Sequence, residues 1–163
     1  MLAHQPPFLW IIAAVLALAM TGAAVVDART YRIPNLITYP AMAILVLLQT
    51  VSDGWPGALQ ATAGLLLAGA CMLPPFLLGV MGAGDVKLMA VAGAALGTAS
   101  VLTVLIFTSV AGGLQAVMMV SMHVLRGGNA ANRPKVCYGV AIAVGTLAAL
   151  AWHVSGRDYI VLF

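Results

Sequence analysis

The chain has 163 residues, of which 63% are apolar and 7% are charged, whereas about a quarter of the residues of an ordinary soluble domain are charged. Seven basic and four acidic side chains are too few to cover a water-soluble globule, so the composition indicates an integral membrane protein. The net charge of +3 is spread over short loops. It forms no continuous basic face and argues against a nucleic-acid partner.

Apolar runs recur along the chain and predict an all-α, polytopic membrane helix bundle, because one crossing takes about 20 apolar residues. In chain order the runs cover 8–26, 36–51, 58–80, 88–96, 101–124 and 138–154. The fourth run is about half as long as a bilayer core requires. We therefore expect either a half-helix after a re-entrant loop or a helix that begins further back, with Asp85 already below the surface. Pro74 and Pro75 predict a kink or break near the end of the third segment.

Alternating the loops between the two sides of the membrane places six of the seven basic residues on one face. These are Arg29, Arg32, Lys87, Arg126, Arg133 and Lys135. By the positive-inside rule that face is cytoplasmic, and both termini then point away from the cytoplasm. Gly93 and Gly97 form a GxxxG pattern in the fourth segment, which favours close helix packing. Packing within the chain is the simpler use of this pattern, and dimerisation is the alternative.

Two of the four acidic residues stand out, because Asp27 and Asp85 each adjoin an apolar run at the same membrane face, 58 residues apart. Charges in such places are costly and tend to be functional. If the first and fourth segments pack together, the two carboxylates can face each other and share one proton. Such a pair is suited to hydrolysis, because one oxygen takes a proton from water while the protonated acid donates to the scissile carbonyl. The alternative is two helix-end acids paired with nearby cations: Arg29, Arg32 or Lys87.

The local motifs favour two carboxylates that face each other over two acids that pair with cations. Gly82-Ala83-Gly84-Asp85 is a GxGD motif, in which we expect the glycines to adopt positive φ and bring the acid close to substrate. Val86-Lys87-Leu88 follows it, and five residues separate Asp27 from Ile33-Pro34-Asn35. Together these motifs closely resemble the type IV prepilin peptidase family of GxGD aspartic proteases. The segment 138–143 (YGVAIA) is similar to the family's PYGxAIA segment, with Cys137 in place of the proline.

The resemblance implies an aspartic endopeptidase of the bacterial inner membrane, with Asp27 and Asp85 as the catalytic pair. It implies cleavage, at the cytoplasmic face, of a basic leader from a prepilin, just ahead of the pilin's apolar N-terminal helix. The expected partners are the prepilin, the bilayer and the pilus assembly machinery. We expect no cofactor and no metal, since the three histidines fall on three separate segments.

Five further residues are expected to shape the site: Gly82, Gly84, Lys87, Pro34 and Asn35. Lys87 can act on the proton affinity of the pair, meet acidic groups of the substrate, or extend to lipid headgroups. Pro34 and Asn35 are expected to fix the start of the second helix, the proline by its preset φ and the asparagine as a cap or turn former. A direct substrate role for Asn35 is the alternative.

Longer members of the resembled family carry an N-terminal part with a cysteine-rich loop and an N-methyltransferase. This chain has two cysteines and no CxxC pair, so we expect residues 1–163 to form a single peptidase domain of the short branch associated with tight-adherence (Flp) pili. Two other classes of function compete with this interpretation. One is a non-catalytic subunit of a pilus or secretion system, and the other is a small ion or proton transporter, although a transport path usually places an acid well inside a span.

Overall fold

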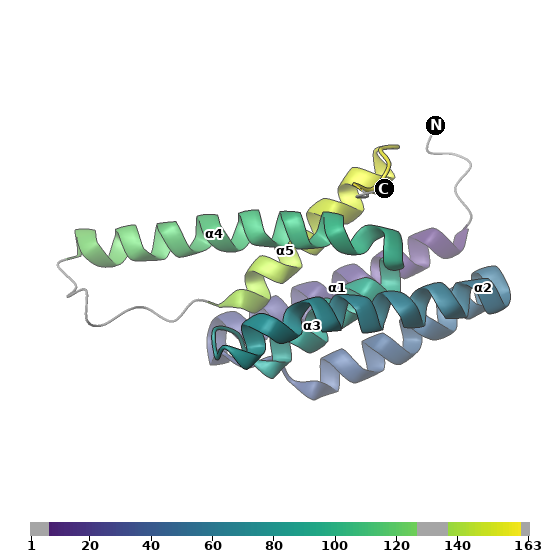
Figure 1. The fold of residues 1–163 in the computed structure, drawn as a ribbon, viewed down its shortest axis with the longest axis horizontal. Helices are drawn as coiled ribbons and strands as arrows, with labels where there is room; N and C mark the ends of the chain where they lie inside the picture. The colour runs from purple at the N-terminus through teal and green to yellow at the C-terminus, as the bar shows by residue number, and fades with distance from the viewer. Residues whose placement is uncertain (1–6, 127–136, 161–163) are drawn as a thin grey trace.

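The computed structural model describes residues 7–126 and 137–160, and the regular structure in these ranges is entirely helical (Figure 1). The elements are α1 (Pro7–Thr30), α2 (Asn35–Leu77), α3 (Ala83–Leu96), the short 3-10 helix η2 (Thr98–Ser100), α4 (Val101–Leu125) and α5 (Tyr138–Val154). By length and composition, three helical stretches suffice to cross a membrane, and α5 is a shorter apolar helix. The all-α membrane bundle predicted from the sequence is confirmed.

The helix α2 consists of two legs joined at Gly54. With 43 residues it is about twice as long as one crossing requires. Gly54 has φ 65° and ψ −144°, which interrupts the helix, and Figure 1 shows the chain turning back at this point. Residues 35–53 form the first leg and residues 55–77 the second. The second and third predicted segments correspond to these legs, so the bundle has about six segments, as expected.

Of the kink or break expected at Pro74 and Pro75, the structure shows a helix that ends shortly after the two prolines without a kink. α2 continues to Leu77, and Gly54 is the one position inside it with non-helical dihedrals. Each proline removes one backbone N–H from the helix, but the pair lies within the last turn. The helix therefore loses few hydrogen bonds and simply ends two residues later.

The fourth segment, α3, lies at the centre of the bundle. It begins at Ala83, and its 14 residues span about 21 Å. The helix thus begins two residues before Asp85, and it is still shorter than a bilayer core of about 30 Å. Every residue from Leu88 to Ala95 is buried, which is the pattern of a helix surrounded by others.

Small residues bring α3 against the second leg of α2. A Cβ added to Gly93 would collide with the carbonyl oxygen of Gly64, and one added to Gly64 would collide with Gly93 and come within 2.9 Å of the backbone of Gly97. The GxxxG pattern therefore packs within the chain, as the simpler interpretation expects. This close backbone approach is the usual means of helix association in lipid, where apolar burial alone provides little drive.

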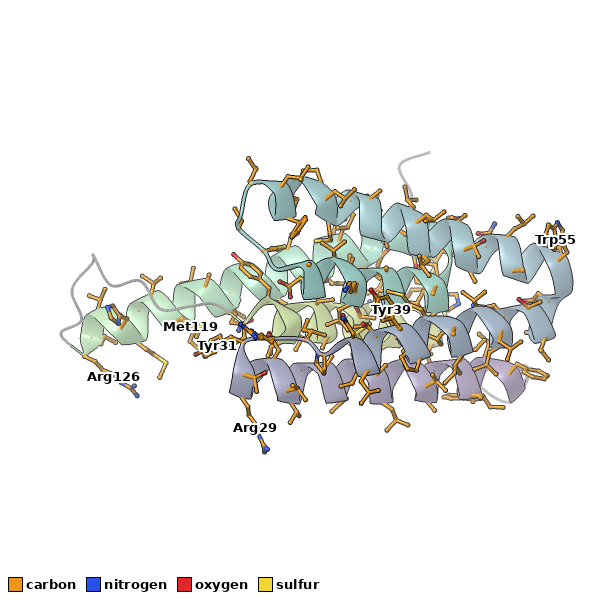
Figure 2. The ribbon with its side chains drawn as sticks, turned by 90° about the horizontal axis from the view of Figure 1, so that it is seen from below. Arg29, Tyr31, Tyr39, Trp55, Met119 and Arg126 are labelled. Carbon is orange, nitrogen blue, oxygen red and sulfur yellow. The ribbon has the colours of Figure 1, made fainter. Side chains whose placement is uncertain are left out.

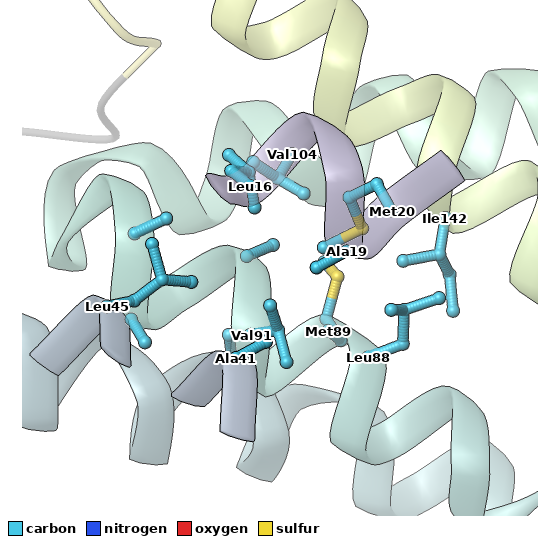
Figure 3. Close-up of a cluster of buried hydrophobic side chains, with 14 of the residues drawn as sticks. Leu16, Ala19, Met20, Ala41, Leu45, Leu88, Met89, Val91, Val104 and Ile142 are labelled. Carbon is cyan, nitrogen blue, oxygen red and sulfur yellow. The ribbon is translucent and has the colours of Figure 1, made fainter. Parts of the chain in front are cut away.

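One cluster of buried apolar side chains connects α3 to the other helices (Figure 3). Its fully buried members come from α1, both legs of α2, α3, α4 and α5. They include Leu16, Met20, Leu45, Leu88, Met89, Val91, Val104 and Ile142. The shared core fixes the depth and rotation of α3 relative to α1 and α5, and so it fixes where their ends meet.

The end of α1 and the beginnings of α3 and α5 meet at one end of the bundle, which we call the aspartate end because Asp27 and Asp85 lie there. Figure 2 shows Arg29 and Arg126 toward this end and Trp55 at the opposite end. Arg32 follows the end of α1 and Lys87 lies near the beginning of α3, so the four described members of the predicted six lie toward this end. Two of the predicted six, Arg133 and Lys135, lie outside the described residues.

Candidate active site

The two aspartates expected to form a pair lie together in the structure. Asp27 is in the last turn of α1 and Asp85 is in the first turn of α3, and their side chains are 5% and 8% exposed. Both line one open pocket with about 510 Å³ of empty space. The two carboxylates are also close enough to act electrostatically on each other. Helix ends that are 58 residues apart in the sequence thus bring two buried acids to a common cavity.

Asp27 is held by the beginning of α5. The backbone N–H of Gly139 donates a hydrogen bond to Oδ2 of Asp27 at 2.9 Å. This N–H belongs to the first turn of α5, where a backbone N–H has no acceptor within the helix. The positive end of the helix dipole also faces the carboxylate. Asp27 thereby provides an acceptor for a backbone N–H at the start of a helix, 112 residues further along the chain.

Asp85 is held by its own turn. The N–H of Gly82 donates to Oδ2 of Asp85 at 2.9 Å, and the N–H of Asp85 donates to the carbonyl oxygen of Gly82 at 3.1 Å. The side chain of Asp85 thus caps the start of α3 as the third-residue acid of a capping box does, while glycine at the N-cap contributes only its backbone. The GxGD motif thus fixes its own acid, because donor and acceptor are three residues apart in the sequence.

The glycines of the GxGD motif do not act as the sequence analysis predicts. Gly82 has φ −84° and ψ 157°, and Gly84 is not among the glycines with positive φ, so the expectation of a left-handed backbone is wrong. Gly84 is explained instead by space, because an added Cβ would lie 2.9 Å from Cβ of Ile33. At Gly82 the nearest atom to an added Cβ is Oδ2 of Asp85 at 3.6 Å, an ordinary contact.

A third glycine, Gly139, is essential to the geometry but received no role in the sequence analysis. A Cβ added there would lie 2.8 Å from Oδ2 of Asp27 and 2.9 Å from Cδ1 of Ile33. Only a glycine lets the first turn of α5 approach Asp27 closely enough to donate its N–H. The sequence feature that points to this role is a glycine at the start of the last apolar run, within the segment 138–143.

Pro34 occupies the position predicted for it, and Asn35 does not act as a cap. Pro34 is the N-cap of α2 with φ −72° and ψ 137°, and its carbonyl oxygen accepts from the N–H of Ile37 at 3.1 Å. No side chain caps this helix. The side chain of Asn35 instead accepts a hydrogen bond at Oδ1 from Nζ of Lys87 at 2.8 Å. Because Pro34 already sets the first turn, Asn35 is free to make this distant contact.

Lys87 connects α3 to the first leg of α2. Besides its bond to Asn35, Nζ of Lys87 lies 4.9 Å from the centre of the Tyr39 ring, a distance at which the cation attracts the ring. We call these three residues the Lys87 clamp. Its contacts are within the protein, so the expected extension of Lys87 to lipid headgroups is not what the structure shows.

The alternative in which the two acids pair with cations has no counterpart in the described part of the chain. Lys87 binds Asn35, and no ion pair joins Asp27 or Asp85 to Arg29 or Arg32. Both carboxylates are therefore held by backbone N–H groups rather than by opposite charges. This leaves them able to exchange protons with a substrate or water in the pocket.

Cys137, which stands where the resembled family has proline, lies directly before α5 and is buried. Burial raises the pKa of its thiol, and the negative charges of Asp27 and Asp85 raise this pKa further. The thiol is therefore neutral beside the two carboxylates. Within residues 7–126 and 137–160, no three His, Cys, Asp or Glu side chains come together in a group that could hold a metal ion.

Comparison with known proteins assigns the chain to a family. No curated protein and no solved structure matches it. A family model does match, over residues 11–117. This range contains α2, α3, most of α1 and α4, and both aspartates, and it covers well over half of the chain. The protein therefore belongs to the type IV leader peptidase family.

Proposed function

We propose that this membrane peptidase is an aspartic endopeptidase that removes the leader from Flp-type type IV prepilins, with Asp27 and Asp85 as its catalytic pair. The observation that carries the proposal is the common pocket of the two buried carboxylates. Each of them is fixed by a backbone N–H and neither forms an ion pair in the described residues. Membership of the leader peptidase family gives the class of reaction.

The proposed mechanism uses one proton shared between the two acids. Two neighbouring carboxylates shielded from water cannot both ionise easily, so the resting pair carries a single negative charge. The ionised carboxylate takes a proton from a water molecule, which attacks the scissile carbonyl carbon. The protonated carboxyl donates its proton to the carbonyl oxygen. Collapse of the tetrahedral intermediate breaks the C–N bond and passes a proton to the leaving amine, without a covalent enzyme intermediate.

The charge distribution supports an active site at the cytoplasmic face of the inner membrane. Arg29 and Arg126 lie toward the aspartate end, and Lys87 lies in the helix turn that follows Asp85. An excess of arginine and lysine marks the cytoplasmic side of a membrane protein. A basic leader in the cytoplasm and an apolar pilin helix in the bilayer would then present the scissile bond at the depth of the pocket. The short Flp-associated branch is proposed from the resemblance of the motifs.

The proposal is tested by leader cleavage in membranes that contain this chain and an Flp-type prepilin, read as the mass of the pilin N-terminus. Asp27→Asn and Asp85→Asn keep the size of the side chain but cannot ionise, so both should leave the leader attached. The matched controls are Asp53→Asn and Asp158→Asn, which change the two exposed acids and should cleave like wild type. All variants must accumulate in the membrane to equal levels.

Cleavage by Asp27→Asn and Asp85→Asn at the wild-type rate would contradict the proposal and favour a non-catalytic assembly subunit. The pH dependence gives a second test. A pair that works with one shared proton loses activity when both acids are protonated and when both are ionised, so the rate should pass through a maximum. A rate that stays constant from about pH 4 to about pH 9 would argue against the shared proton.

A further inference from the structure

One residue beside the aspartates has an unusual backbone. Among the described residues other than glycine, Tyr31 is the one with positive φ, at 54°. This left-handed region is unfavourable for a large side chain, and the residue that ends a helix in this way is usually glycine. Tyr31 directly follows α1, and its N–H donates to the carbonyl oxygen of Asp27 at 2.8 Å. The strained residue thus closes the helix turn that carries the aspartate.

The fold does not use the side chain of Tyr31 to offset this strain. The side chain is 52% exposed, and its hydroxyl and ring have no hydrogen-bond, stacking or cation partner in residues 7–126 and 137–160. The neighbouring Thr30 hydroxyl lies 2.9 Å from the carbonyl oxygen of Val26 and 3.1 Å from that of Arg32, and it can donate to one of them at a time. Glycine at position 31 would keep the turn and remove the strain. Strain that is held in place beside a polar pocket points to a functional side chain.

The left-handed turn directs Tyr31 to the pocket of the two aspartates. Tyr31 lines this pocket together with Asp27, Asp85 and Arg32, and Figure 2 shows it at the aspartate end of the bundle. The lining of this pocket therefore includes an aromatic residue as well as the two aspartates. An aromatic ring of this kind offers a rigid surface on which an extended peptide can lie, with a hydroxyl at its edge.

We propose that Tyr31 is a substrate-binding residue, whose ring contacts the peptide chain directly beside the scissile bond. This inference rests on the proposed function. It assigns to Tyr31 the positioning of the peptide in the pocket and leaves the bond-breaking chemistry to Asp27 and Asp85. The strained turn is then maintained because it keeps the ring at the pocket mouth.

Three variants separate a binding role from a structural one. Tyr31→Gly and Tyr31→Asn both suit a left-handed backbone but lack the ring, whereas Tyr31→Phe keeps it. With purified enzyme and prepilin, we expect KM to rise about tenfold in the first two variants, with kcat within about twofold of wild type. Tyr31→Phe should keep KM within about twofold. The unfolding temperature of Tyr31→Gly should equal or exceed that of wild type.

A crosslinking experiment locates the contact directly. The photoreactive p-benzoylphenylalanine replaces Tyr31 in the Asp85→Asn background, in which the prepilin stays uncut. Its adduct should map to the few residues on either side of the cleavage site. The control places the same group at Trp55, which is 74% exposed at the opposite end of the bundle (Figure 2). It should give no adduct near that site.

Three results would overturn the inference while the proposed function stands. The first is an unchanged KM in Tyr31→Gly, and the second is a parallel loss of activity and unfolding temperature, which would identify the ring as structural. The third is an adduct far from the cleavage site. Failure of the proposed function has a different signature. If the proposed function is wrong, wild type leaves the prepilin intact, or Asp27→Asn and Asp85→Asn both cleave it. The inference about Tyr31 is then overturned together with the function.

Discussion

Asp27 and Asp85 are held in the same chemical way but by partners at very different distances along the chain. Both accept a backbone N–H from the first turn of a helix or from its cap, at 2.9 Å. The donor for Asp85 is Gly82, three residues earlier, whereas the donor for Asp27 is Gly139, 112 residues later. One half of the pair is thus fixed by a local motif, and the other half depends on how α1 packs against α5.

This difference explains which half of the site is vulnerable to changes elsewhere. The turn from Gly82 to Asp85 moves with α3 as a unit, so a shift of the helix carries the acid and its donor together. Asp27 and Gly139 belong to separate helices, and any displacement of α5 changes their distance. We therefore expect substitutions at the start of α5 to affect the pair more than comparable substitutions in the GxGD motif.

The largest effect that tests this comparison is expected from Gly139→Ala. The added methyl group would lie 2.8 Å from Oδ2 of Asp27, so either the carboxylate or α5 must move. Misplacement of a catalytic group by about 1 Å can reduce a rate about 100-fold, and we expect kcat/KM for prepilin cleavage to fall by about that factor. The control is Gly113→Ala on α4, where an added Cβ meets nothing within 4 Å. Wild-type cleavage by Gly139→Ala would show that this contact is not required.

A smaller effect is expected within the GxGD motif, and it should differ between the two glycines. In Gly84→Ala the new methyl group lies 2.9 Å from Cβ of Ile33, but in Gly82→Ala it lies 3.6 Å from Oδ2 of Asp85. Overpacking of this kind costs about 1–3 kcal/mol. We expect kcat/KM to fall about tenfold for Gly84→Ala and to stay within about twofold for Gly82→Ala. The reverse order would refute the explanation by space.

The Lys87 clamp should contribute to stability rather than to the chemistry. Lys87→Met and Asn35→Ala each remove the hydrogen bond between Nζ and Oδ1, and we expect each to lower the free energy of unfolding in detergent by about 1 kcal/mol. Because both changes remove the same contact, the double variant should be little worse than either single variant. Losses that add in full would show that the two side chains act independently.

The smallest effect is expected at the entry to α5. Cys137 has φ −82°, close to the range that proline requires, so Cys137→Pro can be accommodated without moving Gly139. Restricting the unfolded chain should raise the free energy of unfolding by about 0.4–1 kcal/mol, with cleavage within about twofold of wild type. Denaturant titration and the cleavage assay check this together. A destabilised variant would show that the family's proline does not fit this entry.

Most of the fold could be predicted from the apolar runs, because segment length and hydropathy are local properties. The missing details depend on how helices end. α1 continues through Thr30, four residues beyond the apolar run, and so includes Asp27 within a helix rather than after one. Pro74 and Pro75 could be identified as a helix-breaking pair. Whether such a pair bends a helix or ends it depends on how many residues of the helix follow the prolines, and here two follow.

The site could be predicted in part, for the same reason that its two halves differ. Asp85 and its motif form a local unit, and Asp27 was recognised by its place beside an apolar run. The roles of Gly84, Gly139 and Asn35 depend on neighbours that are distant in the sequence, namely Ile33 in the loop after α1, Asp27 in α1 and Lys87 in α3. Glycine in a motif suggests unusual dihedral angles when only the sequence is available, whereas close approach of two helices becomes visible only in three dimensions.

The most direct test of the pair is a double-mutant cycle on cleavage rate. Wild type, Asp27→Asn, Asp85→Asn and the double variant are purified in one detergent and compared at equal concentration of folded protein. If the two acids work as one unit, each single variant should lose nearly as much activity as the double variant, because removing either partner disables both. If the double variant instead loses the product of two partial single losses, or if one single variant keeps the wild-type rate, Asp27 and Asp85 do not form a catalytic pair.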